Sequence, residues 1–292
     1  MSSASSSIAR QSVFRPYLNL ARISNTPTVI SNVLAGVVLA TVLEWDWLIV
    51  ALCVSMALFY TAGMYLNDIL DLDIDRVQRP ERPIPSGIVP LRRAWIITIA
   101  MFGIGLALLI PAGWAAFIAG VVLIGAIALY DSWHKENPGG PFIMGATRVL
   151  VYVVAFLAFS TDWTWEATLW CAAMLFYVAG LTSIAKTEHG PVGLRYWPVV
   201  SLYVPAALAL IRSFELGVII IAIAMILWGI YSCTFVYIPE RRSIGGAIAR
   251  LIAGISLLDA LVLATHEAWW GVAIALAAFG ATLYLQRWVR GT

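Results

Sequence analysis

The sequence predicts an all-α membrane protein, a polytopic bundle of about nine to ten transmembrane helices. The chain has 292 residues, of which 61% are hydrophobic and only 12% are charged, and its mean hydropathy is +0.88. Apolar stretches of spanning length recur along it, separated by polar turns. This composition excludes an ordinary soluble protein. No basic run interleaved with aromatic residues is present, so we expect no binding to nucleic acid.

Ten apolar segments justify this fold class when they are taken in chain order. Most are long enough to cross the roughly 30 Å hydrocarbon core of a bilayer as a helix. The segment at 197–211 is the weakest, because it is short and is interrupted by Pro198 and Pro205. The expected segments are 26–43, 47–67, 93–111, 114–130, 142–160, 166–185, 197–211, 216–237, 246–264 and 268–286.

The chain divides into a short tail and one membrane domain. Residues 1–16 are rich in serine and lack the apolar core of a signal peptide, so we expect a disordered N-terminal tail. Residues 17–292 contain no linker or change of composition, so a single transmembrane domain is the simplest organisation.

Basic residues are distributed unevenly between the two sides of the expected bundle. If the N-terminus is inside and the segments alternate, seventeen of the 18 lysines and arginines fall on the inner side. Only Arg212 falls on the outer side. Cytoplasmic loops of membrane proteins carry such an excess of positive charge. We therefore expect a multi-pass protein of the inner, cytoplasmic membrane, with both termini and the long polar loops in the cytoplasm.

Four carboxylates directly follow the second apolar segment, where membrane proteins rarely tolerate even one. Asp68, Asp71 and Asp75 are spaced i, i+3 and i+7, so a continuous helix would place them on one face. Asn67 would lie one turn from Asp71, and Asp73 would point away. Mg²⁺ prefers a few carboxylates and shares its other positions with waters and phosphates. The cluster predicts a Mg²⁺ site for a phosphate ester, with Asn67 among its ligands.

A segment stiffened by three prolines follows the acids. It begins at Arg79 and reads Arg-Pro-Glu-Arg-Pro-Ile-Pro-Ser-Gly. Proline prevents the helix from continuing, and the guanidinium groups of Arg79 and Arg82 can contact diphosphate oxygens. The motif at 67–75 together with this tail resembles the first signature of the UbiA family of intramembrane prenyltransferases.

This resemblance implies a helical bundle around a central cavity that opens to lipid. It also implies Mg²⁺-dependent transfer of a prenyl group from a prenyl diphosphate to a lipophilic, often aromatic, acceptor in the bilayer, with Asp68, Asp71 and Asp75 as the catalytic acids. An allylic cation formed in this chemistry can be stabilised by aromatic faces. Tyr60, Tyr65 and Tyr130 are candidates for that role.

Further candidate residues lie on the first and fifth apolar segments and on the second inner loop. Lys135 matches a lysine that contacts diphosphate in the family. Arg148 lies inside an apolar segment, so we expect either substrate contact or a structural ion pair. Asn25 and Asn32 are expected either to face the cavity or to form interhelical hydrogen bonds, and Tyr130 is a further polar group expected at the cavity.

The third inner loop departs from the family pattern. The family usually carries two aspartates four residues apart here, whereas this chain has Thr187 in place of the first, and Glu188 is the only carboxylate. The segment is similar to that of the EboC-like members. We hypothesise that Lys186 and Lys135 replace part of the missing metal charge, with Glu188 near the cavity. Altered or lost chemistry remains the other interpretation.

Two alternative functions follow from different classes of protein. A degenerate prenyltransferase scaffold could bind lipid or isoprenoid without catalysis, as the missing second acidic motif suggests. A CDP-alcohol phosphotransferase also uses intramembrane aspartates and Mg²⁺. That class expects an Asp-Gly pair, an Ala-Arg pair and a later Gly-x-x-x-Asp-x-x-x-Asp, and this pattern is not found in the sequence.

The charge asymmetry predicts the membrane sidedness of the loops. Single cysteines introduced beside Arg82 and beside Arg241 should react with an impermeant thiol reagent from the same side of the membrane. A cysteine beside Arg212 should react from the other side. A labelling map that places Arg241 opposite Arg82 would contradict the predicted topology.

Overall fold

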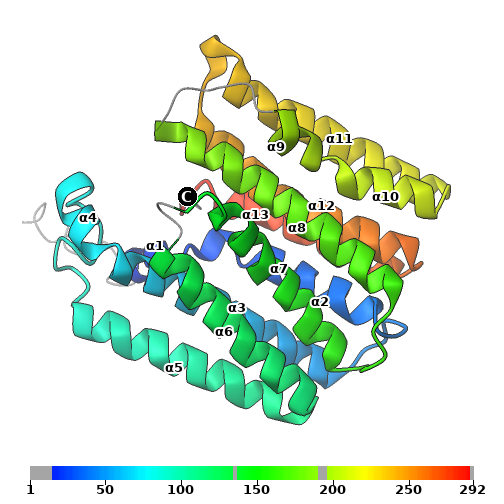
Figure 1. The fold of residues 1–292 in the computed structure, drawn as a ribbon, viewed down its shortest axis with the longest axis horizontal. Helices are drawn as coiled ribbons and strands as arrows, with labels where there is room; N and C mark the ends of the chain where they lie inside the picture. Colours follow the sequence, from blue (N-terminus) through cyan, green and yellow to red (C-terminus); the bar gives the residue numbers. More distant parts are fainter. Residues whose placement is uncertain (1–14, 134–136, 190–195, 290–292) are drawn as a thin grey trace, which may run out of the picture.

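The computed structural model describes residues 15–133, 137–189 and 196–289, and this part of the chain folds as a bundle of helices without strands (Figure 1). The all-α class predicted from the sequence is confirmed. Among the described residues, seven helices are long and apolar enough to cross a membrane, with a 3-10 turn extending α5 to Ala112. They are α3 (Trp47–Leu70), α5 (Leu91–Leu109), α6 (Trp114–Trp133), α7 (Gly140–Leu157), α8 (Trp165–Ala185), α11 (Leu216–Tyr237) and α12 (Ile244–Thr265).

Three shorter apolar helical segments complete the set of ten that the sequence predicted. They are η2 with α2 (Ile23–Asn25 and Pro27–Val38), α9 with α10 (Tyr196–Ser201 and Val204–Arg212), and α13 (Trp269–Leu285). The second and third match the expected ranges 197–211 and 268–286 to within one residue, whereas the first begins and ends earlier than the expected 26–43, at Ile23 and Val38. Pro205 occupies the first turn of α10, where no intrahelical partner is needed for its missing N–H. Proline cannot donate to the carbonyl four residues earlier, at Ser201, so α9 does not continue through it.

Short helices outside the spans gather at one end of the bundle. The chain runs back and forth, so the C-terminal ends of α3, α6 and α8 share this end with the N-terminal ends of α5, α7 and α12. Figure 1 shows α1 (Arg15–Leu20) and α4 (Leu72–Gln78) at the same end. α1 therefore begins within the predicted tail, of which residues 1–14 lie outside the described part. The polar segments that the sequence singled out are thus brought close together.

α12 occupies the centre of the bundle and α5 its periphery. α12 packs against α2, α8, α11 and α13, and most of its residues are buried. α5 packs mainly on α3 and exposes an apolar face that includes Ile96, Ile99 and Ile104. An exposed face of this kind is expected of a helix that contacts lipid tails.

Glycine permits a close approach between α2 and α7. A Cβ atom added to Gly36 would lie 2.7 Å from the Cβ of Ala155 and 2.8 Å from the carbonyl oxygen of Tyr152. Small residues at helix interfaces allow backbones to approach in this way. The absence of a side chain at Gly36 therefore lets α2 pack directly on the backbone of α7.

A side chain at this contact should destabilise the protein. Gly36→Val should lower the thermal unfolding midpoint in detergent, with a loss of about 1–3 kcal/mol, because the backbone of α7 cannot give way as a flexible side chain would. The matched control is Gly103→Val on α5, where an added Cβ meets nothing within 4 Å. Equal midpoints for the two variants would contradict the close approach.

Candidate functional site

The acidic motif lies where α3 passes into α4, and the helix is broken at Asp71 rather than continuous as expected. Asp71 has φ −84° and ψ 0°, and its backbone N–H still donates to the Asn67 carbonyl at 2.9 Å. Asp68 and Asp75 remain on one buried side, at 6% and 5% exposure. Asp73 points outward, where its carboxylate pairs with Arg76 at 3.0 Å, as its position in the motif predicted.

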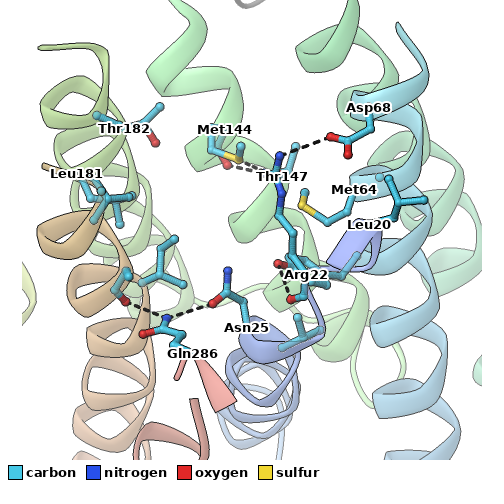
Figure 2. Close-up of a pocket in the computed structure, with 18 of the residues that line it drawn as sticks. Leu20, Arg22, Asn25, Met64, Asp68, Met144, Thr147, Leu181, Thr182 and Gln286 are labelled. Atoms are coloured by element: carbon cyan, nitrogen blue, oxygen red, sulfur yellow. Dashed lines mark hydrogen bonds and ion pairs between the residues drawn. The ribbon is translucent and has the colours of Figure 1, made fainter. Parts of the chain in front are cut away.

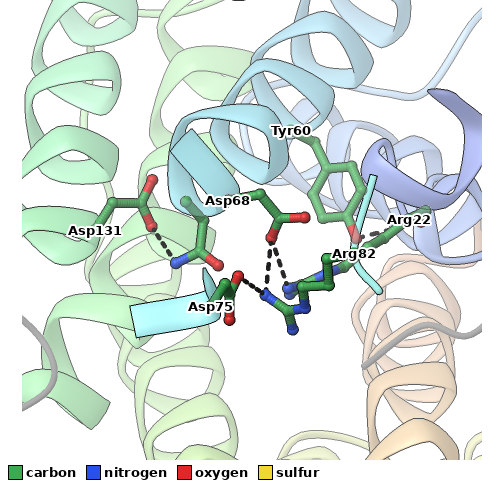
Figure 3. Close-up of polar contacts among 7 residues, drawn as sticks. Arg22, Tyr60, Asp68, Asp75, Arg82 and Asp131 are labelled. Carbon is green, nitrogen blue, oxygen red and sulfur yellow. Dashed lines mark hydrogen bonds and ion pairs between the residues drawn. The ribbon is translucent and has the colours of Figure 1, made fainter. Parts of the chain in front are cut away.

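The proline-rich tail folds back over the acids and delivers Arg82 to them. Ile84 and Val89 are buried against α1 and the end of α3, which anchors the loop. The Nη1 atom of Arg82 lies 2.6 Å from Asp75 Oδ2 and 3.4 Å from Asp68 Oδ1 (Figure 3). One guanidinium therefore bridges two carboxylates, and this contact joins the loop to the helix end.

A second arginine reaches the same carboxylate from the first apolar segment. Arg22 Nη2 lies 3.5 Å from Asp68 Oδ1. The backbone of Arg22 has φ 42° and ψ 45°, a left-handed conformation that costs a non-glycine residue about 1–2 kcal/mol. The hydroxyl of Tyr60 donates to the Arg22 carbonyl at 3.5 Å. Arg22 was not among the predicted site residues, because no short-range pattern connects it to Asp68.

Asp131 on α6 is another acid of this cluster that the sequence motif did not include. Its Oδ1 accepts a hydrogen bond from Asn67 Nδ2 at 3.2 Å. Its Oδ2 is buried and has no hydrogen-bond partner among the described residues. The negative charge of Asp71 acts on both Asp68 and Asp131, so the three acids lie near one another. An acid at the polar end of an apolar helix was the only sequence signal for Asp131.

The donor chemistry of this cluster fits Mg²⁺. Asn67, Asp68, Asp71 and Asp131 offer the oxygen ligands that Mg²⁺ prefers, and Asp131 Oδ2 is an open ligand atom. Within the described ranges, however, no group of three His, Cys, Asp or Glu side chains is arranged to hold a metal ion. The expected convergence of Asp68, Asp71 and Asp75 is therefore not found, because Asp68 and Asp75 face Arg82 instead.

Below the acids lies a cavity of about 1280 Å³ between α3, α6, α7, α8 and α12. Figure 2 shows Arg22 reaching toward Asp68 on one side and Asn25 meeting Gln286 on another. Gln286 Nε2 donates to Asn25 Oδ1 at 3.0 Å and to the Ala249 carbonyl at 2.9 Å. The remaining wall is largely apolar and includes aromatic side chains. The cavity thus joins a charged mouth to an interior suited to hydrocarbon.

The structure brings several predicted residues to this cavity. Its lining includes Asp68, Arg79, Arg82, Tyr130, Arg148, Asn25 and Tyr60. Asn32 does not line it and forms interhelical hydrogen bonds instead, which was the alternative interpretation. The hydroxyl of Tyr65 donates to the Tyr17 carbonyl at 3.0 Å, away from the cavity. Tyr65 is therefore not placed to face an allylic cation there.

The second and third inner loops are described only in part. Lys186 follows α8, is exposed, and donates to the Asn137 carbonyl at 2.8 Å. It therefore contacts the second loop rather than the cavity lining. Lys135 and the side chain of Glu188 lie outside the described residues, so the roles predicted for them stay predictions.

Comparison with known proteins identifies the family of this chain. The model of the UbiA prenyltransferase family matches residues 29–243. The chain belongs to this family. Among curated relatives, this UbiA-family protein is 32% identical to the digeranylgeranylglyceryl phosphate synthase of Sulfolobus acidocaldarius over 139 residues, 47% of this chain and 50% of the relative. The chain thus spans about half the length of the curated relatives it matches.

Solved structures share the fold of this UbiA-family protein over most of its length. An apo UbiA homologue from Aeropyrum pernix K1 matches 82% of this chain and 97% of its own, with a TM-score of 0.66 and 19% identity. A homologue from Archaeoglobus fulgidus, solved with GPP and Mg²⁺, matches 88% of this chain and 99% of its own, with a TM-score of 0.63 and 16% identity. At these identities the likeness shows the fold.

The Arg82 bridge predicts a difference between two arginines of this UbiA-family protein. Arg82→Gln should destabilise it by about 3 kcal/mol, because Asp68 and Asp75 would keep their burial and lose a shared cation. Arg76→Gln should have almost no effect, since the pair of Arg76 and Asp73 is exposed. The thermal unfolding midpoint measures both effects, as does the rate of proteolytic cleavage in the proline-rich loop that begins at Arg79. Equal sensitivity of the two variants would contradict the bridge.

Proposed function

We propose that this chain is a Mg²⁺-dependent prenyltransferase that moves a prenyl group from a prenyl diphosphate to a lipophilic, often aromatic, acceptor within the membrane. One observation carries the proposal. A cluster of acids and arginines lies directly at the mouth of a largely apolar cavity. A prenyl diphosphate has the same two parts, a polyanionic head and a hydrocarbon tail. Membership of the prenyltransferase family supports this function, as do the name of the Sulfolobus relative and the ligands of the Archaeoglobus homologue.

The arginines at the cavity mouth suit the diphosphate head. Arg79 and Arg82 line the mouth, and Arg22 approaches it from the first apolar segment. Guanidinium groups form strong, directed hydrogen bonds to phosphate oxygens. Lys135 and Lys186 belong to neighbouring loops, and we propose that they add positive charge around the same head. When Mg²⁺ is bound by the carboxylates, it neutralises charge on the departing diphosphate.

We propose Asn67, Asp68, Asp71 and Asp75 as the groups that hold the cation. Asp131 extends this set, because its Oδ1 accepts a hydrogen bond from Asn67 while its Oδ2 has no partner among the described residues. For Asp68 or Asp75 to bind a cation, Arg82 must release that carboxylate. An arriving diphosphate offers Arg82 a new anionic partner, so head-group binding and release of the acids are chemically matched.

The cavity wall supplies the remaining requirements of the transfer. The bond between the allylic carbon and the diphosphate oxygen breaks with its electron pair leaving on the diphosphate. The acceptor then bonds to the allylic carbon and releases a proton. Tyr60 and Tyr130 both line the cavity. The Tyr60 ring lies against the Arg148 guanidinium, so we propose that the face of Tyr130, near the polar end of α6, stabilises the developing positive charge. The apolar wall excludes water, which would otherwise capture that cation.

The same geometry supports a membrane-embedded location for the reaction. The seven spanning helices and the exposed apolar faces favour an integral, multi-pass membrane protein. We propose that the mouth lies on the cytoplasmic side of the inner membrane, because the arginine-rich loops are located there in the positive-inside arrangement.

A second candidate function is non-catalytic binding of an isoprenoid on a degenerate scaffold. It is favoured by the Arg82 bridge, which occupies two of the expected metal-binding acids, and by the missing second acidic motif. This candidate predicts that prenyl diphosphate binds without Mg²⁺ and without release of diphosphate. The first candidate predicts Mg²⁺-dependent binding, with diphosphate released once a suitable acceptor is present.

Two aspartates of the same motif separate these candidates. Asp71→Ala should reduce Mg²⁺-dependent binding of geranyl diphosphate at least 100-fold, because it removes a ligand at the centre of the acid cluster. Asp73→Ala should change binding less than threefold, because Asp73 is exposed and points away. Isothermal titration with and without Mg²⁺ measures both. Normal binding by Asp71→Ala would contradict the proposed site.

A further inference from the structure

A buried polar cluster lies deep in the bundle, away from the acids at the mouth. Asp259 on α12 is completely buried. Its carboxylate accepts hydrogen bonds from the Tyr152 hydroxyl at 2.6 Å, the Ser31 hydroxyl at 2.5 Å and the Asn32 amide at 2.8 and 2.9 Å. An aspartate inside a spanning helix is costly, and residues of this kind are commonly functional. Asp259 does not line the cavity, so any role in it must be indirect.

Asn32 connects Asp259 to Arg148. The Asn32 Nδ2 atom donates to Asp259, and its Oδ1 accepts a hydrogen bond from Arg148 Nη1 at 3.0 Å. A carboxylate can only accept here and a guanidinium can only donate, so the orientation of the amide is unambiguous. Asp259 therefore holds the amide with its oxygen toward Arg148.

Arg148 carries this connection into the cavity. Its side chain lines the cavity, and its guanidinium carbon lies 5.3 Å from the ring centre of Tyr60. A guanidinium has five N–H donors. In the part of the chain that the structure describes, Asn32 is the residue that accepts a hydrogen bond from it. Donors beyond that bond are thus available to a molecule in the cavity.

The position of Arg148 separates it from the diphosphate head. Tyr60 precedes Asp68 by eight residues on α3, which corresponds to about 12 Å along the helix axis. Arg148, stacked against Tyr60, therefore lies about two helical turns below the mouth. The cavity wall around it is mainly apolar and includes Val151 and Val178. The guanidinium of Arg148 would gain no favourable interaction with a hydrocarbon tail at this depth. It would repel a developing allylic cation.

We infer that Arg148 is the recognition point for an anionic oxygen on the acceptor, and that Asp259 is a positioning residue that holds Arg148 through Asn32. The ligand class is an acceptor with a carboxylate, phosphate or comparable anionic group remote from the carbon that is alkylated. This inference rests on the proposed prenyl transfer. The sequence allowed Arg148 either a diphosphate contact or a structural ion pair, and its depth favours this third role.

Binding of small aromatic anions tests the inference directly. The full chain in lipid nanodiscs, loaded with Mg²⁺ and geranyl diphosphate, is titrated with benzoate, phenyl phosphate and the uncharged isostere benzamide. The native protein should bind at least one anion tenfold or more tightly than benzamide, and the preferred anion distinguishes a carboxylate from a phosphate. Arg148→Gln should abolish this preference, and Arg148→Lys should retain part of it.

Variants of the supporting residues test the positioning role. Asp259→Asn should weaken binding of the preferred anion threefold to tenfold, because the Asn32 amide loses a fixed acceptor. The matched control is Ser256→Ala, which removes a buried α12 hydroxyl that contacts Ser31. That variant should bind the anion normally. Equal effects of Asp259→Asn and Ser256→Ala would show a merely structural role and overturn the positioning claim.

Binding of geranyl diphosphate alone reports folding and separates this inference from the proposed function. Arg148→Gln should bind geranyl diphosphate within twofold of the native protein. A loss as large as that of Asp71→Ala would assign Arg148 to the diphosphate and overturn the inference, as would equal native binding of anions and benzamide. Failure of the native protein to bind geranyl diphosphate would instead overturn the proposed function. The same titration with benzoate, phenyl phosphate and benzamide, repeated without geranyl diphosphate, would then still test the anion preference.

Discussion

Arg82 donates to Asp75 and to Asp68 at the end of α3, and the organisation of the cavity mouth depends on this bridge. Two buried carboxylates with no cation would strongly destabilise a membrane bundle. The bridge neutralises them, and it also fixes the proline-rich loop over the cavity, where Arg79 becomes part of the lining. A structural ion pair and a candidate substrate site are therefore formed by the same three side chains.

Charge balance in this protein is organised at two depths. At the mouth, Arg22 and Arg82 face the carboxylates of the acidic motif. Deeper in the bundle, Arg148 is balanced by Asp259 through the amide of Asn32. Asp68, Asp75 and Asp259 thus each have specific hydrogen-bonding partners, as burial in a low-dielectric interior requires. Guanidinium donors reach the cavity at both depths, so the same pairs that stabilise the bundle also give the cavity its polarity.

The fold and the first acidic motif could be predicted from the sequence because each depends on residues that are close together along the chain. Apolar segment length determines helix positions in a membrane, and the spacing of the motif correctly placed Asp73 outside. The break at Asp71 could not be read from spacing, since spacing describes a continuous helix. The residues on either side of the break, Ile69 and Leu72, pack in one buried cluster with Ile84 and Val89 of the loop.

Residues that meet only in the folded bundle were the ones that the sequence did not reveal. Asp131 joins Asn67 across 64 positions, and Asp259 joins Asn32 across 227. Neither acid belongs to a periodic or clustered pattern, so each looked like an isolated polar residue. The three carboxylates of the motif do not gather at one point for a related reason, because Arg82 lies between Asp68 and Asp75. Their role as metal ligands stays a prediction.

The central claim is that the acids at the mouth exchange Arg82 for a divalent cation when a diphosphate binds. A crystal structure grown with Mn²⁺ and geranyl diphosphate tests this claim most directly, since manganese is located by its anomalous scattering. The account predicts a manganese peak beside Asp68 and Asp71, with Arg82 moved from the carboxylates to the diphosphate. An intact bridge between Arg82, Asp68 and Asp75 with no manganese at the mouth would contradict it.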